Sequence, residues 1–125
     1  MARILIVDDE KLARMTVRQM LEGEGHEIHD AGDGQAALEQ LAGTHVDVVV
    51  TDIIMPEKEG IQTIIELRRE FPDVKIIAMS GGGRVGNVDF LSVAKDIGAV
   101  HVLRKPFRQA ELLDAVNDCL AGGEA

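Results

Sequence analysis

The side chains best suited to chemistry stand just after short apolar runs of the sequence. They are an acidic pair, Asp8 and Asp9, followed much later by Asp52, Ser80 and Lys105. Carboxylates held close together oppose each other's ionisation, so a cluster of three needs a proton or a cation. Mg²⁺ suits such a cluster, because it prefers oxygen ligands and is often held by one or two carboxylates, waters and a phosphate oxygen. The alternative for Asp8 or Asp9 alone is to cap the helix that follows, a role that aspartate fills well.

Asp52 also has the chemistry of a nucleophile. A carboxylate can attack a phosphoryl group and form an acyl phosphate, and Met55-Pro56 interrupts regular structure just after it. Lys105 could neutralise a phosphate oxygen as a compact charge, and the Ser80 hydroxyl could hydrogen-bond to one. Taken singly, a lysine before a proline is usually solvated and a serine after a strand is often an ordinary turn residue. The pattern therefore indicates phosphoryl chemistry only if the fold brings these groups together.

Alternating strand and helix signals predict how these residues are positioned. Apolar runs at residues 4–7, 46–51, 74–79 and 100–103, with a weaker one at 26–29, alternate with five stretches of helical period. Nearly continuous Val and Ile content is typical of parallel strands covered on both faces. We therefore predict an α/β fold, a doubly wound five-stranded parallel sheet with helices on both faces. The carboxyl ends of such strands surround one crevice, where ligands bind.

Length and charge narrow the possibilities further. A chain of 125 residues predicts one domain, residues 1–121, with a short flexible tail at 122–125. The formal charge of -9 opposes direct binding to nucleic acid. No run approaches the roughly 20 apolar residues of a membrane helix, so we expect no membrane contact and a cytoplasmic location. The single cysteine, Cys119, is predicted to be a small buried hydrophobe rather than a reactive thiol.

Four segments give the chain a specific resemblance. They are ILIVDDE near the start, VVVTDIIMPEKEG around Asp52, IIAMS ending at Ser80, and LRKPF around Lys105. In this order and spacing they resemble the receiver domain of response regulators in two-component signal transduction, in particular a stand-alone, chemotaxis-regulator-like receiver. The resemblance runs from about Arg3 to Leu120, and it implies a flavodoxin-like sheet of strand order 2-1-3-4-5.

The resemblance also implies roles for individual residues. Asp52 would be the phosphoacceptor, Ser80 the switch hydroxyl, and Lys105 the phosphate-binding lysine, in a cis peptide with Pro106. Mg²⁺ would be bound directly by Asp9 and Asp52, through water by Asp8, and by the backbone carbonyl of Ile54. Such a domain is a signalling phosphoacceptor rather than an enzyme with an external substrate, since it catalyses only its own phosphorylation and dephosphorylation. Its partners would be a histidine kinase or phosphotransfer protein, and a downstream target bound by the face of the fourth helix, fifth strand and fifth helix.

Three features depart from the receiver pattern. Val102 stands where receivers commonly place an aromatic residue, and alternation along a strand directs the adjacent His101 to the opposite side. Ile54 is apolar where a polar side chain could position the hydrolytic water, so we expect a longer-lived phosphoryl group. The loop from Gly81 to Gly86 matches a G-x-G-x-x-G pattern, but a dinucleotide fingerprint belongs after the first strand. We interpret this loop as a turn before the fourth helix.

Two other functions remain open at this stage. An aspartyl-nucleophile phosphatase of the haloacid-dehalogenase type also uses Mg²⁺, but it needs a second acid where Ile54 stands. A receiver-like interaction module would bind partners without any phosphorylation. The sequence does not name the kinase or the target, and it leaves open phosphorylation-driven dimerisation and attachment to a longer protein.

Overall fold

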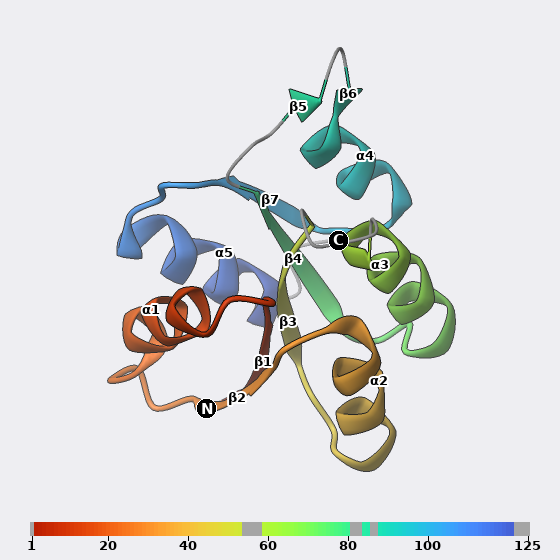
Figure 1. Cartoon of the computed structure of the whole chain (residues 1–125). Helices are drawn as coiled ribbons and strands as arrows, with labels where there is room; N and C mark the ends of the chain where they lie inside the picture. The colour runs from red at the N-terminus through yellow and green to blue at the C-terminus, as the bar shows by residue number, and fades with distance from the viewer. Residues whose placement is uncertain (1, 54–58, 81–83, 86–87, 122–125) are drawn as a thin grey trace.

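The alternation of strands and helices predicted from the sequence is present in the structure (Figure 1). This computed structural model describes residues 2–53, 59–80, 84–85 and 88–121. Its elements are β1 (Arg3–Val7), α1 (Lys11–Leu21), β2 (Glu27–Ala31), α2 (Gly34–Gly43), β3 (Val48–Asp52), α3 (Glu59–Glu70), β4 (Lys75–Ser80), β5 (Arg84–Val85), β6 (Val88–Asp89), α4 (Phe90–Ile97), β7 (His101–Arg104) and α5 (Gln109–Leu120).

The main sheet has five parallel strands in the order β2-β1-β3-β4-β7. Counted along this sheet alone, the order is the predicted 2-1-3-4-5, so the fold class is confirmed. From β1 the chain adds β2 on one side of the sheet, and it then adds β3, β4 and β7 on the other side. The order of the strands therefore switches between β1 and β3, which are neighbours in the sheet. Doubly wound folds bind their ligands at such a switch point, here at the carboxyl ends of β1 and β3.

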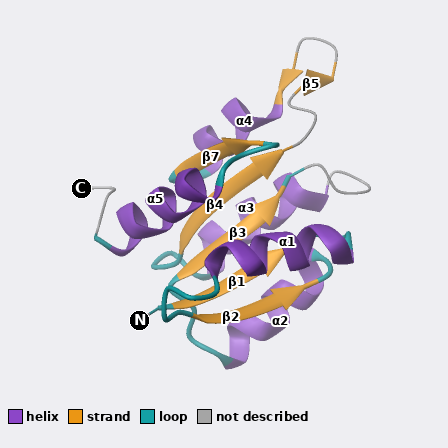
Figure 2. Ribbon diagram, turned by 90° about the vertical axis from the view of Figure 1, so that its left-hand side faces the viewer, coloured by secondary structure: helices purple, strands orange, loops and turns teal. Residues whose placement is uncertain are grey.

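Helices cover both faces of the sheet, with α1 and α5 on one face and α2, α3 and α4 on the other (Figure 2). Alternation along β1 shows the pattern, because Ile4 and Ile6 pack toward α1 and α5 while Leu5 and Val7 pack toward the opposite helices. All four side chains are fully buried. Cys119 is buried in the hydrophobic core between the sheet and the α1–α5 layer, as predicted.

Local signals explain where several elements begin or turn. Asp33 caps α2, since its side chain accepts a hydrogen bond from the Ala36 N–H at 2.8 Å. Gly98 has a φ of +137° in the connection from α4 to β7, and the Arg68 side chain packs where a Cβ would stand. Any other residue would be strained at this position, so Gly98 is needed to bring β7, and Lys105 after it, into place.

One element differs from the prediction. The loop interpreted as a turn contains β5, which forms a short antiparallel pair with β6 just beyond it; Arg84 is opposite Asp89 and Val85 is opposite Val88. Two-residue strands are too short for alternation to reveal them. The predicted ligand Ile54, the glycines at 81–83 and 86, and the predicted tail at 122–125 lie outside the described residues. Within the described part, no helix is both long and apolar enough to cross a membrane.

Candidate functional site

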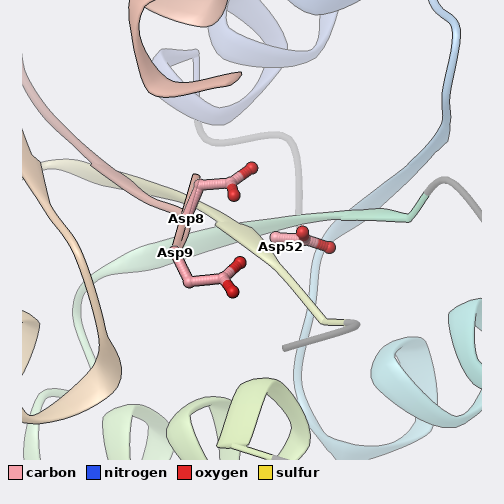
Figure 3. A group of neighbouring side chains, drawn as sticks. All are labelled: Asp8, Asp9 and Asp52. Atoms are coloured by element: carbon pink, nitrogen blue, oxygen red, sulfur yellow. The ribbon is translucent and has the colours of Figure 1, made fainter. Parts of the chain in front are cut away.

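The three aspartates singled out from the sequence meet at the carboxyl edge of the sheet. Asp8 and Asp9 follow β1, Asp52 ends β3, and one carboxylate oxygen of each lies within 4.8 Å of the others (Figure 3). Asp8 is fully buried and Asp52 is 6% exposed, whereas Asp9 is exposed to solvent. Two nearly buried carboxylates beside a third are costly unless a cation neutralises them.

Hydrogen bonds on both sides fix the backbone and side chain of Asp8. Its N–H donates to the Ala31 carbonyl at 3.2 Å, and its Oδ1 accepts from the Glu10 N–H at 3.0 Å. The N-cap of α1 is Glu10, and the side chain of Glu10 makes no capping hydrogen bond. Neither aspartate is therefore the N-cap residue of α1, and the carboxylates of both lie beside that of Asp52 (Figure 3).

Lys105 is the cation that the structure brings to these carboxylates. Its Nζ lies 3.3 Å from Asp8 Oδ2 and 3.6 Å from Asp52 Oδ2. Its backbone is tied to the neighbouring strand, because the Lys105 N–H donates to the Ser80 carbonyl at 2.8 Å. The peptide bond from Lys105 to Pro106 is cis, as the resemblance implied. An exposed ammonium would gain little from such contacts, but this lysine side chain is only 26% exposed.

Ser80 lies at the same edge. It is the last residue of β4, is 1% exposed and pairs with Arg104 of β7. Asp52 pairs with Met79, the residue just before Ser80. Ser80 and the predicted phosphoacceptor Asp52 therefore lie at the ends of neighbouring strands. The structure thus brings Asp8, Asp9, Asp52, Ser80 and Lys105 to one edge of the sheet.

The donor set fits Mg²⁺. Three carboxylates and one lysine leave a formal charge of two negatives, which a divalent cation balances. Oxygens bound to one Mg²⁺ lie roughly 3–4 Å apart, so donors already within 4.8 Å of one another need only small side-chain rotations. The observed group supplies hard oxygen ligands, and water and a phosphate oxygen commonly complete such a coordination shell.

Arg14 contacts the site, although no motif in the sequence includes it. It lies in α1, and its Nη1 donates to the backbone carbonyl of Asp8 at 2.8 Å. Its side chain is 19% exposed. Arginine on an amphipathic helix is normally a solvated residue, so the sequence alone offers no signal for this contact.

The residues at the position of the usual aromatic switch lie on opposite faces, as alternation predicted. Val102 packs against the core on the α2, α3 and α4 side, whereas His101 Nε2 lies 2.6 Å from Asp118 Oδ2 of α5. His101 therefore joins the edge strand to α5 and does not occupy the place of Val102.

Comparison with known proteins decides the family. A sequence model of the response regulator receiver domain matches residues 4–117. The chain belongs to this family. Receiver domains are signalling domains of two-component systems, and they interact with histidine kinases and downstream effectors.

Relatives with full-length sequences are longer proteins that contain such a domain. The chain is 41% identical over 118 residues to the transcriptional regulatory protein PdtaR of Mycobacterium tuberculosis, covering 91% of this chain and 54% of that protein. It is 36% identical over 121 residues to the sensor kinase CckA of Brucella abortus, covering 95% of this chain and 12% of the kinase. The chain thus spans about half of the first relative and a small part of the second.

Solved structures agree with this assignment over nearly the whole receiver. A receiver domain protein from Clostridium thermocellum superposes with a TM-score of 0.87 and 28% identity, covering 99% of this chain and 98% of that one. A CheY-like receiver domain protein from Methanospirillum hungatei JF-1 has the same TM-score and identity, covering 99% and 97%. The flavodoxin-like receiver fold is therefore confirmed.

Proposed function

We propose that this receiver accepts a phosphoryl group on Asp52 from a phosphohistidine, with Mg²⁺, and thereby switches a protein-interaction surface. The observation that carries the proposal is the approach of Lys105 Nζ to both Asp8 Oδ2 and Asp52 Oδ2, with Asp9 beside them. Asp8, Asp9 and Asp52 are the proposed metal ligands, together with the backbone carbonyl of Ile54, which lies outside the described residues. Bound Mg²⁺ would neutralise charge on the phosphoryl oxygens.

The proposed transfer exchanges one bond to phosphorus for another. An oxygen of the Asp52 carboxylate bonds to phosphorus while the bond from phosphorus to the donor's imidazole nitrogen breaks. That nitrogen keeps the electron pair and can then take a proton from water. Lys105 offsets the negative charge of the phosphoryl oxygens from its own side of the crevice, because it is already within 3.6 Å of the attacking carboxylate.

The proposed output involves the strand ends that border the crevice. Ser80 can donate its hydroxyl proton to a phosphoryl oxygen on Asp52, and its carbonyl already accepts the Lys105 N–H. Any shift at Ser80 therefore acts directly on the end of β7. Because His101 joins β7 to Asp118 of α5, the face formed by α4, β7 and α5 is the proposed docking surface for a downstream protein.

A phosphodonor protein would have to cover the rim of the same crevice. An apolar cavity of about 270 Å³ opens beside Lys105 and is lined by Ala13, Thr16, Val17, Met20, Lys105, Pro106 and Phe107. We expect a docked phosphodonor protein to contact these apolar side chains beside Lys105.

Intact-protein mass after incubation with acetyl phosphate tests the proposal. We expect a gain of one phosphoryl group that requires Mg²⁺, is absent in Asp52→Asn, and persists in the control Asp73→Asn, whose aspartate is exposed beyond the opposite end of the sheet. Equal labelling of Asp52→Asn would overturn the assignment of the phosphoacceptor. Sustained turnover of a generic phosphate ester would instead indicate a phosphatase, and partner binding insensitive to Asp52→Asn would indicate a phosphorylation-independent module.

A further inference from the structure

Arg14 joins three segments that border the acidic crevice. Its Nη1 donates to the Asp8 carbonyl at 2.8 Å, and its Nε lies 3.7 Å from Asp30 Oδ1 on β2. A Cβ added to Gly32, after β2, would lie 3.4 Å from the same Nη1. With a side chain only 19% exposed, the guanidinium is enclosed between α1, the end of β1 and the end of β2.

The contact with the Asp8 carbonyl controls the direction of Asp9. The Asp8 carbonyl and the Asp9 N–H belong to one planar peptide unit, so holding that oxygen fixes the orientation of the bond leading into Asp9. The Asp8 side chain is held separately, by the Glu10 N–H and by Lys105. Asp9 is the exposed member of the acidic group, so its position depends more on its backbone.

We propose that Arg14 is a positioning residue that sets the Mg²⁺ affinity of the receiver by fixing the Asp8–Asp9 peptide. This inference rests on the proposed function, because it assigns Mg²⁺ to the acidic group. Mg²⁺ demands near-ideal octahedral geometry, so a small rotation of one carboxylate lowers its affinity. The positive charge of Arg14 would by itself oppose Mg²⁺, and Asp30, with Oδ1 3.7 Å from Nε, offsets part of that charge.

The neighbouring Arg18 provides a matched control one turn along α1. It also binds Asp30, with Nη1 3.2 Å from Oδ2, and it also donates to a backbone carbonyl, that of Ile28, at 3.1 Å. Arg18 thus resembles Arg14 in residue type, helix and acidic partner, while its carbonyl contact is on β2 rather than on the acidic loop. A variant at Arg18 reports the general cost of weakening the network around Asp30.

The experiment measures Mg²⁺ binding by calorimetric titration of wild type, Arg14→Gln, Arg14→Lys and Arg18→Gln. We expect the dissociation constant to rise about tenfold in Arg14→Gln, the size expected for losing a charge-assisted hydrogen bond. The dissociation constant should rise by a similar factor in Arg14→Lys, because an ammonium group cannot contact both Asp8 and Asp30 as the two nitrogens of the guanidinium do. Arg18→Gln should bind Mg²⁺ within about twofold of wild type, because it leaves the Asp8 contact in place.

Two further readouts separate positioning from loss of folding. In acetyl phosphate labelling, Arg14→Gln should need about tenfold more Mg²⁺ for half the maximal rate but keep its rate at saturating Mg²⁺. In the metal-free protein, amide exchange at residues 8–10 should accelerate in Arg14→Gln and stay unchanged in Arg18→Gln.

Each alternative outcome has a distinct meaning. If Arg14→Lys bound Mg²⁺ as tightly as the wild type, the effect of Arg14 would be one of charge and not of positioning. If the Mg²⁺ dissociation constant rose equally in Arg14→Gln and Arg18→Gln, the effect would be one of general stability. Unchanged Mg²⁺ binding in Arg14→Gln would overturn the inference and leave the proposed function intact. Absence of Mg²⁺ binding by the wild type would overturn the metal assignment and this inference with it.

Discussion

Carboxylates gather at both ends of the main sheet, but in very different surroundings. At the amino end, Asp47 accepts the Arg3 N–H at 2.9 Å and contacts His45 Nε2 at 3.0 Å, and its side chain is 38% exposed. Glu27 pairs with the Arg3 guanidinium at 2.8 Å and is 43% exposed. At the carboxyl end, Asp8 is fully buried, Asp52 has a side chain 9% exposed, and both contact the same lysine.

The difference separates a structural network from a site. The amino-end carboxylates have well-matched partners in solvent, where ion pairs contribute little to stability. Both carboxylates also have a pKa below the ordinary value. The largest cause is the hydrogen bond with His29 for Glu27 and the hydrogen bond from the Arg3 N–H for Asp47. The carboxyl-end group carries excess negative charge out of water, which costs stability and is typical of functional positions.

The largest expected effect comes from removing the shared cation. Lys105→Met should slow labelling by acetyl phosphate by about 100-fold or more, because the charge on the transferring group loses its fixed countercharge. It should also destabilise the metal-free protein by roughly 1–3 kcal/mol, and Mg²⁺ should restore part of that loss. Time courses of intact mass and urea unfolding measure the two effects. Labelling slowed by less than about threefold, or slowed equally in the exposed-site control Lys95→Met, would contradict the role of Lys105.

Neutralising one buried carboxylate should have the opposite effect on stability. Asp8→Asn should stabilise the metal-free protein by about 1 kcal/mol, because it relieves repulsion with Asp52 while the amide oxygen can still accept the Glu10 N–H. The same variant should lose most of the stabilisation that Mg²⁺ gives the wild type. Urea unfolding with and without Mg²⁺ measures both quantities. A destabilised Asp8→Asn would show that the contact with Lys105 outweighs the repulsion.

At the amino end, removing a carboxylate should destabilise the fold. Asp47→Ala should cost about 0.5–1 kcal/mol, since it removes the acceptor of the Arg3 N–H at a partly exposed position. Mg²⁺ binding and labelling should not change, because Asp47 precedes β3 at the far end of the sheet from Asp52. The same urea series tests this prediction. A stabilising Asp47→Ala would remove the contrast between the two ends.

The smallest expected effect is in the acid dependence of the same variant. The Arg3 N–H holds the pKa of Asp47 below its ordinary value of 3.8, despite an opposing effect of burial. A carboxyl whose pKa is lower in the folded state stabilises the protein above the ordinary pKa, and this stabilisation is lost as the pH falls through the folded value. The difference between wild type and Asp47→Ala should therefore narrow below about pH 4, by a few tenths of a kcal/mol. A constant difference from pH 6 to pH 3 would exclude this linkage.

The sequence was sufficient to predict the five parallel strands and the edge where the polar residues gather. Strand alternation also placed His101 and Val102 on opposite faces, and the apolar stripe of the last helix placed Cys119 in the core. These predictions succeeded because burial imposes a period on each element that is readable without coordinates. The β5–β6 pair escaped prediction because two residues carry no period.

The sequence by itself determined the fold class, the family and the five polar residues that meet at the carboxyl edge of the sheet, because hydrophobic period and motif spacing are properties of the chain. Only the tertiary structure decided which charges are buried, that Lys105 contacts both Asp8 and Asp52, and that Arg14 holds the Asp8 carbonyl. These contacts join residues from different elements, and a side chain's reach and exposure depend on how those elements pack. The proposed chemistry depends on both: residue types set by the sequence and distances set by packing.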